Sequence, residues 1–243
     1  MPVILHIETS TNICSVALSS GGVCIFSKSN DEGLNHARLL SLFIEEALAF
    51  LTEKGERLDA VAVSSGPGSY TGLRIGASTA KGLCYGLDIP LIAVSTLEIM
   101  SQSIVGSRQS SVGSRQSSEF KTNDYQLTTN DLLCPMIDAR RMEVFAAFFD
   151  NNNLVRPISA DIIDENSYAD ILAEQKVYFF GNGAEKCKAV LTHPNAVFLE
   201  NIVPLAENMI TLAEQKFAGK QFEDTAYFEP FYLKEFQAST TPP

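Results

Sequence analysis

Apolar and polar positions divide the chain into short β-rich runs and longer segments with helical spacing. Three runs near the start predict strands: residues 4–8, 13–18 and 23–26. Two longer segments have helical spacing: residues 36–51, with Asn35 as a plausible N-cap, and 71–87. The β-branched run Val61-Ala62-Val63 lies between them and predicts a strand. This order predicts an α/β domain built on a mixed sheet.

The second half of the chain shows a similar pattern with weaker signals. Four apolar runs predict strands: residues 132–138, 143–150, a short run near Leu154, and 177–180. Pro204 suits the first turn of a helix and Gly219 suits its end, so a final helix is predicted over about 204–217.

The stretch from Ser64 to Gly76 carries the strongest motif. It reads Ser-Ser-Gly-Pro-Gly-Ser-Tyr-Thr-Gly-Leu-Arg-Ile-Gly and joins a predicted strand to a predicted helix. Such a turn can bring backbone N–H groups at a helix N-terminus up to an anion, and glycine permits that close approach. The spacing fits neither the Walker loop nor the dinucleotide fingerprint. Gly66, Gly68 and Ser69 are therefore candidate phosphate-binding residues, with a tight structural turn as the alternative.

A polar turn after the first strand is a second candidate for the same site. Glu8, Thr9 and Ser10 begin this turn. The element order is that of the ribonuclease-H-like, actin-like nucleotide-binding folds, in which an acidic residue and small hydroxyls at this hairpin face the phosphates. An ordinary turn is the alternative. Gly181 and Gly183, which follow the run 177–180, are further phosphate candidates, or else they form a simple strand–helix turn.

Several motifs together resemble the bacterial TsaB family, also called YeaZ and long grouped with the M22 glycoprotease-like proteins. The resemblance covers nearly the whole chain apart from roughly residues 103–130. Its motifs are Ile7-Glu8-Thr9-Ser10, Gly66 to Gly76, Val94 to Glu98, Ile137 to Phe145, Gly181-Asn182-Gly183 and Pro230 to Lys234. The resemblance implies an α/β, actin-like ATPase or ribonuclease-H-like fold of two subdomains, each with a mixed sheet flanked by helices. The expected divisions are an N-terminal subdomain (1–102), a flexible insertion (103–130), a second subdomain (131–203) and a C-terminal helix and tail returning to the first (204–243).

The resemblance also implies a role in tRNA modification. TsaB resembles the catalytic subunit TsaD but is treated as its non-catalytic partner. With the ATPase TsaE, the pair transfers a threonylcarbamoyl group to N6 of adenosine 37 in tRNAs that read ANN codons. The implied partners are a TsaD-like subunit, a TsaE-like ATPase and a second copy of the chain, with tRNA reached only through the complex. The chain is expected to require no cofactor, with ATP or ADP a candidate ligand at the complex interface.

The chain lacks two histidines that serve the TsaD relatives. In those relatives the segment after the corresponding strand reads Val-Asn-His-Met-Glu-Gly-His, and its histidines bind a metal. Here Val94 to Met100 reads Val-Ser-Thr-Leu-Glu-Ile-Met, so Thr96 and Met100 stand at the two histidine positions. A hydroxyl and a thioether are poor ligands for metals that imidazole holds. The sequence therefore predicts no metal site and no catalytic residue in this subunit.

Composition narrows the function classes. The net charge is −11, from 18 basic and 29 acidic side chains, and no basic stripe is visible, which argues against independent tRNA binding. Five scattered cysteines without a Cys-x-x-Cys pair indicate reduced thiols and a cytoplasmic location. No apolar run is long enough to cross a bilayer, so no membrane partner is expected.

The segments 36–51 and 71–87 are candidates for the partner surface, because the helices at these positions in TsaB relatives form the homodimer and TsaD interfaces. The first has an unusually wide apolar arc, and the second places small residues on one face. The predicted interface comprises Leu40, Phe43, Ile44, Ala47, Gly72, Arg74, Gly76 and Ala80. For both helices, packing within the chain's own fold is the alternative.

One segment of the chain is duplicated. The heptad at 105–111 is repeated at 112–118, and its polar composition without an apolar seam predicts a surface insertion.

A small-molecule kinase or phosphotransferase of the actin-like fold is the alternative function, and it would turn over ATP. A peptidase is a third interpretation, although no His-Glu-x-x-His is present.

Overall fold

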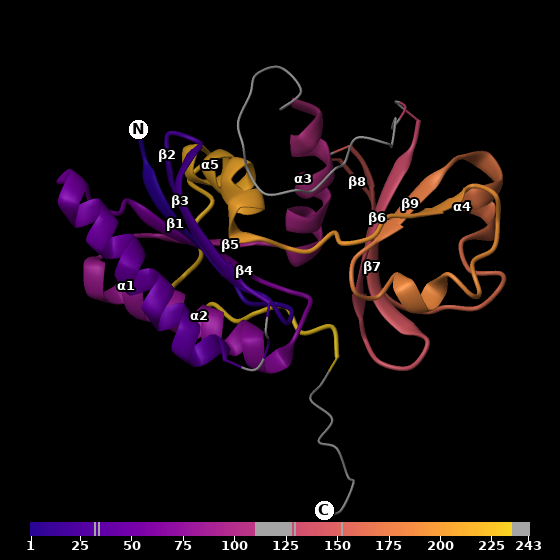
Figure 1. Ribbon diagram of the computed structural model, residues 1–243, viewed down its shortest axis with the longest axis horizontal. Coiled ribbons are helices and arrows are strands. Elements are labelled where there is room, and N and C mark those ends of the chain that lie inside the picture. The colour runs from indigo at the N-terminus through magenta and orange to yellow at the C-terminus, as the bar shows by residue number, and fades with distance from the viewer. Residues whose placement is uncertain (32, 34, 110–127, 129, 152, 235–243) are drawn as a thin grey trace, which may run out of the picture.

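The computed structural model describes residues 1–243 except 32, 34, 110–127, 129, 152 and 235–243 (Figure 1). Two five-stranded sheets form two lobes, and helix α3 (Thr96–Gln109) stands between them. The first lobe contains the N-terminus, and the chain returns to it after completing the second lobe.

The first sheet has the strand order β3-β2-β1-β4-β5. The bounds are β1 (Val3–Glu8), β2 (Cys14–Ser20), β3 (Val23–Asn30), β4 (Ala60–Ser64) and β5 (Leu91–Val94). Strands β1, β2 and β3 pair antiparallel, whereas β1, β4 and β5 pair parallel. The predicted mixed sheet is thus confirmed.

Both faces of this sheet are covered, which explains why β1 is buried along its whole length. Helices α1 (His36–Lys54) and α2 (Tyr70–Leu87) pack on one face, against side chains such as Leu5 and Val63. Helix α5 (Ile210–Ala218), preceded by the 3-10 helix η2 (Ala206–Met209), packs on the other face against Ile4 and Ala62. Successive strand residues point to opposite faces, so β1 feeds both cores.

The second sheet repeats this arrangement with the order β10-β9-β6-β7-β8. Its bounds are β6 (Leu132–Asp138), β7 (Glu143–Asp150), β8 (Asn153–Ile162), β9 (Val177–Phe180) and β10 (Ala196–Phe198), with α4 (Ala169–Glu174) and the 3-10 helix η1 (Glu185–Cys187). As in the first sheet, three antiparallel strands are followed by two that join in parallel.

Two boundaries differ from the sequence prediction. The final helix does not begin at Pro204, because Leu205 has an extended backbone and the chain first forms η2 before α5 begins at Ile210. The predicted insertion boundary at residue 103 falls inside α3, which continues to Gln109 with Ile104 buried against the second lobe. The rest of the duplicated heptad, from residue 110 onward, lies outside the described residues.

Helices α1 and α2 differ in how their N-termini are capped. Asn35 precedes α1, as predicted, but its side chain makes no capping hydrogen bond. The Ser69 hydroxyl caps α2 by accepting a hydrogen bond from the backbone N–H of Gly72 at 3.3 Å. The glycine-rich segment therefore contains a helix cap that the sequence analysis did not assign.

After α5, residues 223–234 form a segment without helix, here called the C-terminal strap. Glu223 bridges to Leu91 on the edge of β5, and the N–H of Phe231 donates to the carbonyl of Ser65 at 2.7 Å. At the end of the strap, Lys234 pairs with Glu143 on β7 in the second lobe. The strap thus covers the β5 edge and touches both lobes.

Candidate functional site at the first hairpin and the glycine-rich turn

The candidate site centres on Glu8, the last residue of β1. Its side chain is fully buried, and Oε1 accepts a hydrogen bond from the N–H of Ser10 at 2.6 Å. No partner reaches Oε2 within the described part of the chain. Burial raises the pKa of Glu8 to about 7, because the ionised form loses its hydration. A buried carboxyl that is close to half protonated at neutral pH therefore lies under the first hairpin.

Hydrogen bonds join this hairpin directly to the glycine-rich turn. The Thr9 hydroxyl donates to the carbonyl of Gly72 at 2.8 Å, and the N–H of Ser69 donates to the carbonyl of Ser10 at 2.6 Å. The two sequence motifs, about 60 residues apart, are therefore brought together as the prediction required. At this point the two motifs contact each other.

The glycines of the turn are explained by that contact. A Cβ atom on Gly68 would overlap the carbonyl oxygen of Ser10, and one on Gly72 would overlap the carbonyl of Thr9. Gly66 has φ +102°, and a Cβ there would lie 2.8 Å from the carbonyl of Phe231. The chain's own backbone makes the close approach that a phosphate was expected to make. The glycines therefore give the phosphate prediction no support.

The glycines of the second lobe have the same explanation. Gly181 has φ +99°, and a Cβ there would overlap the Met100 methyl group and the Met136 carbonyl. A Cβ on Gly183 would lie 2.8 Å from the carbonyl carbon of Ile137. The predicted helix after them is only the short η1.

Asp138, at the end of β6, is half exposed and engaged in local contacts. Its carboxylate pairs with Lys186 and accepts from the N–H of Arg140 at 3.2 Å. Among the described residues, no ion pair joins the side chains of the neighbouring arginines to this carboxylate.

The two positions that carry histidines in the TsaD relatives are filled here by core packing. Thr96 and Met100 are both buried, and the Met100 methyl lies directly on Gly181. The Thr96 hydroxyl has no hydrogen-bond partner in the described structure. Neither group is placed as a ligand, and the described residues contain no cluster of three His, Cys, Asp or Glu side chains that could hold a metal ion.

The three histidines of the chain lie apart from one another. His6 is buried beside the Ser19 hydroxyl at 2.9 Å, and burial lowers the pKa of its imidazole to about 3. The ring of His36 contacts the carbonyls of Thr11 and Ile13, and His193 is on the surface. Each has a local structural role or faces solvent.

Seven of the eight residues of the predicted partner interface are not on the surface of the chain. Those seven are buried against the chain's own sheet or first hairpin: Leu40, Phe43, Ile44, Ala47, Gly72, Gly76 and Ala80. A Cβ on Gly76, for example, would overlap the Thr9 hydroxyl. The small-residue face of α2 therefore serves packing within the chain, which was the alternative interpretation. Only Arg74 points outward.

The opposite face of the same two helices is open to solvent. Leu42 of α1 is 43% exposed, and Tyr85 of α2 is 88% exposed. Gly82 and Gly86 have nothing within 4 Å of an added Cβ. We call this surface the α1–α2 outer face: Leu42, Arg74, Gly82, Tyr85, Gly86 and Leu87. The wide apolar arc of residues 36–51 indicated that some apolar side chains of α1 are exposed. The sequence alone did not show which of them face solvent.

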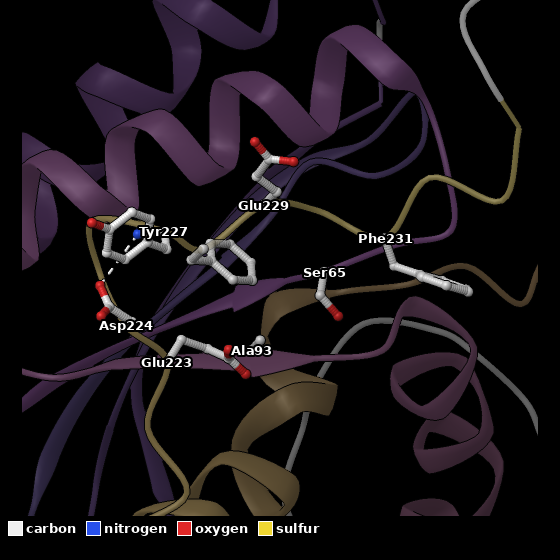
Figure 2. A pocket seen from close by; sticks show the side chains of 8 residues that line it. Ser65, Ala93, Glu223, Asp224, Tyr227, Glu229 and Phe231 are labelled. Carbon is white, nitrogen blue, oxygen red and sulfur yellow. Dashed lines mark hydrogen bonds between the residues drawn. The ribbon is translucent and has the colours of Figure 1, made fainter.

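A cavity of about 380 Å³ lies between the C-terminal strap and the strand ends of the first sheet (Figure 2). Ser65 and Ala93 form its sheet side, and the strap supplies Glu223, Asp224, Tyr227, Phe228, Glu229 and Phe231. Asp224 is engaged in the turn that it begins, because its carboxylate accepts from the N–H of Tyr227. Sequence reasoning did not find this cavity, since the two sides are more than 100 residues apart.

The fold and the site together define an actin-like α/β protein, in which the strand order of one sheet is repeated in the other. A family profile described as TsaD, tRNA N6-adenosine threonylcarbamoyltransferase, matches residues 31–112. The Haemophilus influenzae protein named tRNA threonylcarbamoyladenosine biosynthesis protein TsaB is 27% identical over 95% of this chain and 93% of its own length. The Escherichia coli TsaB protein is also 27% identical, over 95% of this chain and 94% of its own.

Solved structures agree with these sequence relatives. A Pseudomonas aeruginosa crystal structure, described as a protein with similarity to peptidase YEAZ, superposes with a TM-score of 0.74 and 25% identity over 96% of this chain and all of that one. The chain resembles the TsaB family, also called YeaZ, over nearly its whole length. No helix in the described residues is long and apolar enough to cross a membrane.

Proposed function

We propose that the chain acts in the biosynthesis of threonylcarbamoyladenosine in tRNA, as a non-catalytic subunit that binds and activates a TsaD-like transferase. The non-catalytic role is supported by the packing of Met100 on Gly181, because the transferase relatives have a metal-binding histidine at the position of Met100. A thioether held in a core contact cannot serve as that ligand without opening the junction between α3 and the second lobe.

The α1–α2 outer face is the surface we assign to the transferase. It combines exposed apolar side chains with Gly82 and Gly86, at which a partner helix can approach the backbone closely. The same face serves a second copy of the chain, so homodimer and heterodimer would compete. A TsaE-like ATPase, with ATP or ADP at the interface, joins the pair; tRNA modification requires the whole complex.

Size exclusion with mass detection tests the assignment of this surface. The purified chain is mixed with the TsaD-like transferase of the same organism, and a one-to-one complex is expected. Tyr85→Asp should weaken that complex about tenfold or more, because a charge replaces an aromatic ring at the centre of the contact. Tyr227→Asp is the matched control, since Tyr227 is 82% exposed but lies on the strap.

Two results would contradict the proposal. The first is a wild-type chain and transferase that elute separately even with the ATPase and nucleotide present. The second is equal behaviour of the two tyrosine variants, which would leave the complex intact but move it to another surface. Circular dichroism of both variants checks that the fold is preserved, as expected for substitutions of exposed side chains.

The kinase or phosphotransferase alternative is less well supported. It needs an open phosphate site at the glycine-rich turn, and the chain's own backbone makes the close contact at Gly66, Gly68 and Gly72. ATP turnover by the purified chain alone would favour this alternative.

A further inference from the structure

A pair of arginines at the tip of the β6–β7 hairpin is not used by the fold. Arg140 and Arg141 are both exposed, and the described residues offer no carboxylate or other partner to either guanidinium. Both have left-handed backbones, with φ +70° and +49°. Glycine or asparagine would adopt this turn at lower energy, so the turn itself gives no reason for two arginines.

The two carboxylates that flank this pair in the sequence are already occupied. Asp138 is paired with Lys186, and Glu143 is paired with Lys234. The positive charge of the two guanidiniums therefore remains unneutralised at the tip of the hairpin, in a chain whose net charge is −11.

The end of the strap extends this basic surface toward the first lobe. Two residues before Lys234, the ring of Tyr232 lies 5.0 Å from the ring of Tyr70 on α2. The Arg74 guanidinium lies over Tyr70, with its carbon 4.2 Å from the ring centroid. In Figure 1 the strap end runs between the first turn of α2 and the β6–β7 hairpin. The strap end thus has Arg74 of α2 on one side and the β6–β7 hairpin, which carries Arg140 and Arg141, on the other.

This combination matches the chemistry of RNA. Guanidinium groups bind phosphate oxygens in a bidentate manner, and aromatic rings beside them stack on unpaired bases. An acidic peptide would use the arginines but not the rings. A protein of net charge −11 can approach a polyanion only where positive charge is concentrated, and the hairpin tip is such a place.

We infer that the β6–β7 hairpin tip is an RNA-contacting surface, with Arg140 and Arg141 on phosphates and the strap end beside them. This inference rests on the proposed function for its ligand, the tRNA that the complex modifies. It revises the expectation that tRNA is reached only through the partner: the partner holds most of the tRNA, and this subunit adds a local contact.

The test compares two double variants. Arg140→Gln with Arg141→Gln removes the two guanidiniums, whereas Arg57→Gln with Lys220→Gln removes equal charge from exposed positions elsewhere. Binding of unmodified tRNA is followed by fluorescence anisotropy from 20 to about 300 mM salt. The measurement is made with the chain alone and with its complex with the transferase, and size exclusion of each complex is recorded in parallel.

The hairpin variant should bind tRNA about tenfold more weakly than the control, and its salt slope should fall by about 2, one unit for each lost phosphate contact. Its complex with the transferase should form normally. Arg140→Lys with Arg141→Lys should recover most of the salt slope, because the charges return.

Equal tRNA affinity of the hairpin and control variants, in both the isolated chain and the complex, would overturn the inference. So would loss of the transferase complex in the hairpin variant, because the hairpin would then be a protein contact. Failure of the wild-type chain to bind the transferase at all would count against the proposed function instead. In that case the inference is decided by the isolated chain at 20 mM salt.

Discussion

Single glycines decide how the first hairpin and α2 fit together. Gly72 and Gly76 lie against Thr9 so closely that neither has room for a methyl group, whereas Gly82 on the same helix faces open solvent. The spacing of small residues was visible in the sequence. The sequence did not show what these small residues contact, because the residues that pack against them belong to a hairpin more than 60 positions earlier.

This contrast predicts opposite effects for one kind of substitution. Gly76→Ala should destabilise the protein by about 2 kcal/mol or more, because its methyl overlaps the Thr9 hydroxyl. Gly82→Ala should stabilise it by roughly 0.5–1 kcal/mol, since alanine is the better helix former. Urea denaturation of both variants measures the difference. Equal effects would mean that the hairpin does not pack on α2 as described.

The raised pKa of Glu8 predicts a pH dependence of the free energy of unfolding with a definite sign. Burial raises its pKa from 4.5 to about 7, so the folded protein retains a proton that the unfolded chain releases. The contribution of Glu8 to the wild-type free energy of unfolding should therefore fall between about pH 4.5 and 7 and then level off. The difference in pKa corresponds to about 3 kcal/mol.

Glu8→Gln removes this titration, so the variant should gain about 3 kcal/mol relative to the wild type between pH 4.5 and pH 8. Comparing the two proteins cancels the opposite contribution of His6. The lowered pKa of His6 makes both proteins lose stability as the pH falls from 6.5 toward 3. Parallel curves for wild type and variant would show that Glu8 is hydrated in the folded state.

At the scale of elements, hydrophobic pattern located most strands, because runs such as Val177 to Phe180 are buried on both faces. It failed where tertiary contacts set the boundary. Residues 103–109 have a polar composition, yet they continue α3 because Ile104 and Val105 pack against the second lobe. Pro204 carried a helix-start signal, but the extended backbone at Leu205 delays the helix.

The sequence predicted that the C-terminal tail returns to the first lobe, but it did not predict the individual contacts that hold the strap there. Lys81 of α2 donates hydrogen bonds to the carbonyls of Ala226 and Phe228 at 3.1 and 3.0 Å. The helix thereby fixes the part of the strap that forms one side of the cavity in Figure 2.

Lys81→Met should loosen the strap and lower the free energy of unfolding by about 1–2 kcal/mol, because two charge-assisted hydrogen bonds are lost. Amide hydrogen exchange at Phe231 and its neighbours should become faster, while β1 remains protected. Lys176→Met is the control, since Lys176 is exposed and distant in the fold. Unchanged exchange in the strap would show that Lys81 contributes nothing to its placement.

At the scale of the whole molecule, the two lobes repeat one strand order, and the glycine-rich motifs of both serve contacts within the chain. The actin-like fold and its two mixed sheets were predictable, because three antiparallel strands followed by helix and strand are a strong signal of topology. Most of the residues predicted for the partner surface lie on the faces of α1 and α2 that pack within the chain, whereas the surface that we propose lies on the opposite face of the same helices. Only three-dimensional packing distinguishes the side of α1 that meets the sheet from the side that meets solvent.

The most direct test of the central claim is the transfer of labelled threonylcarbamoyl to adenosine 37 of a purified tRNA. Three reactions are compared, each supplied with donor, ATPase and ATP: this chain alone, the transferase alone, and both together. We predict transfer only, or far faster, when both are present, and none by this chain alone. Full activity of the transferase without this chain would contradict the activating role, and transfer by this chain alone would contradict its assignment as a non-catalytic subunit.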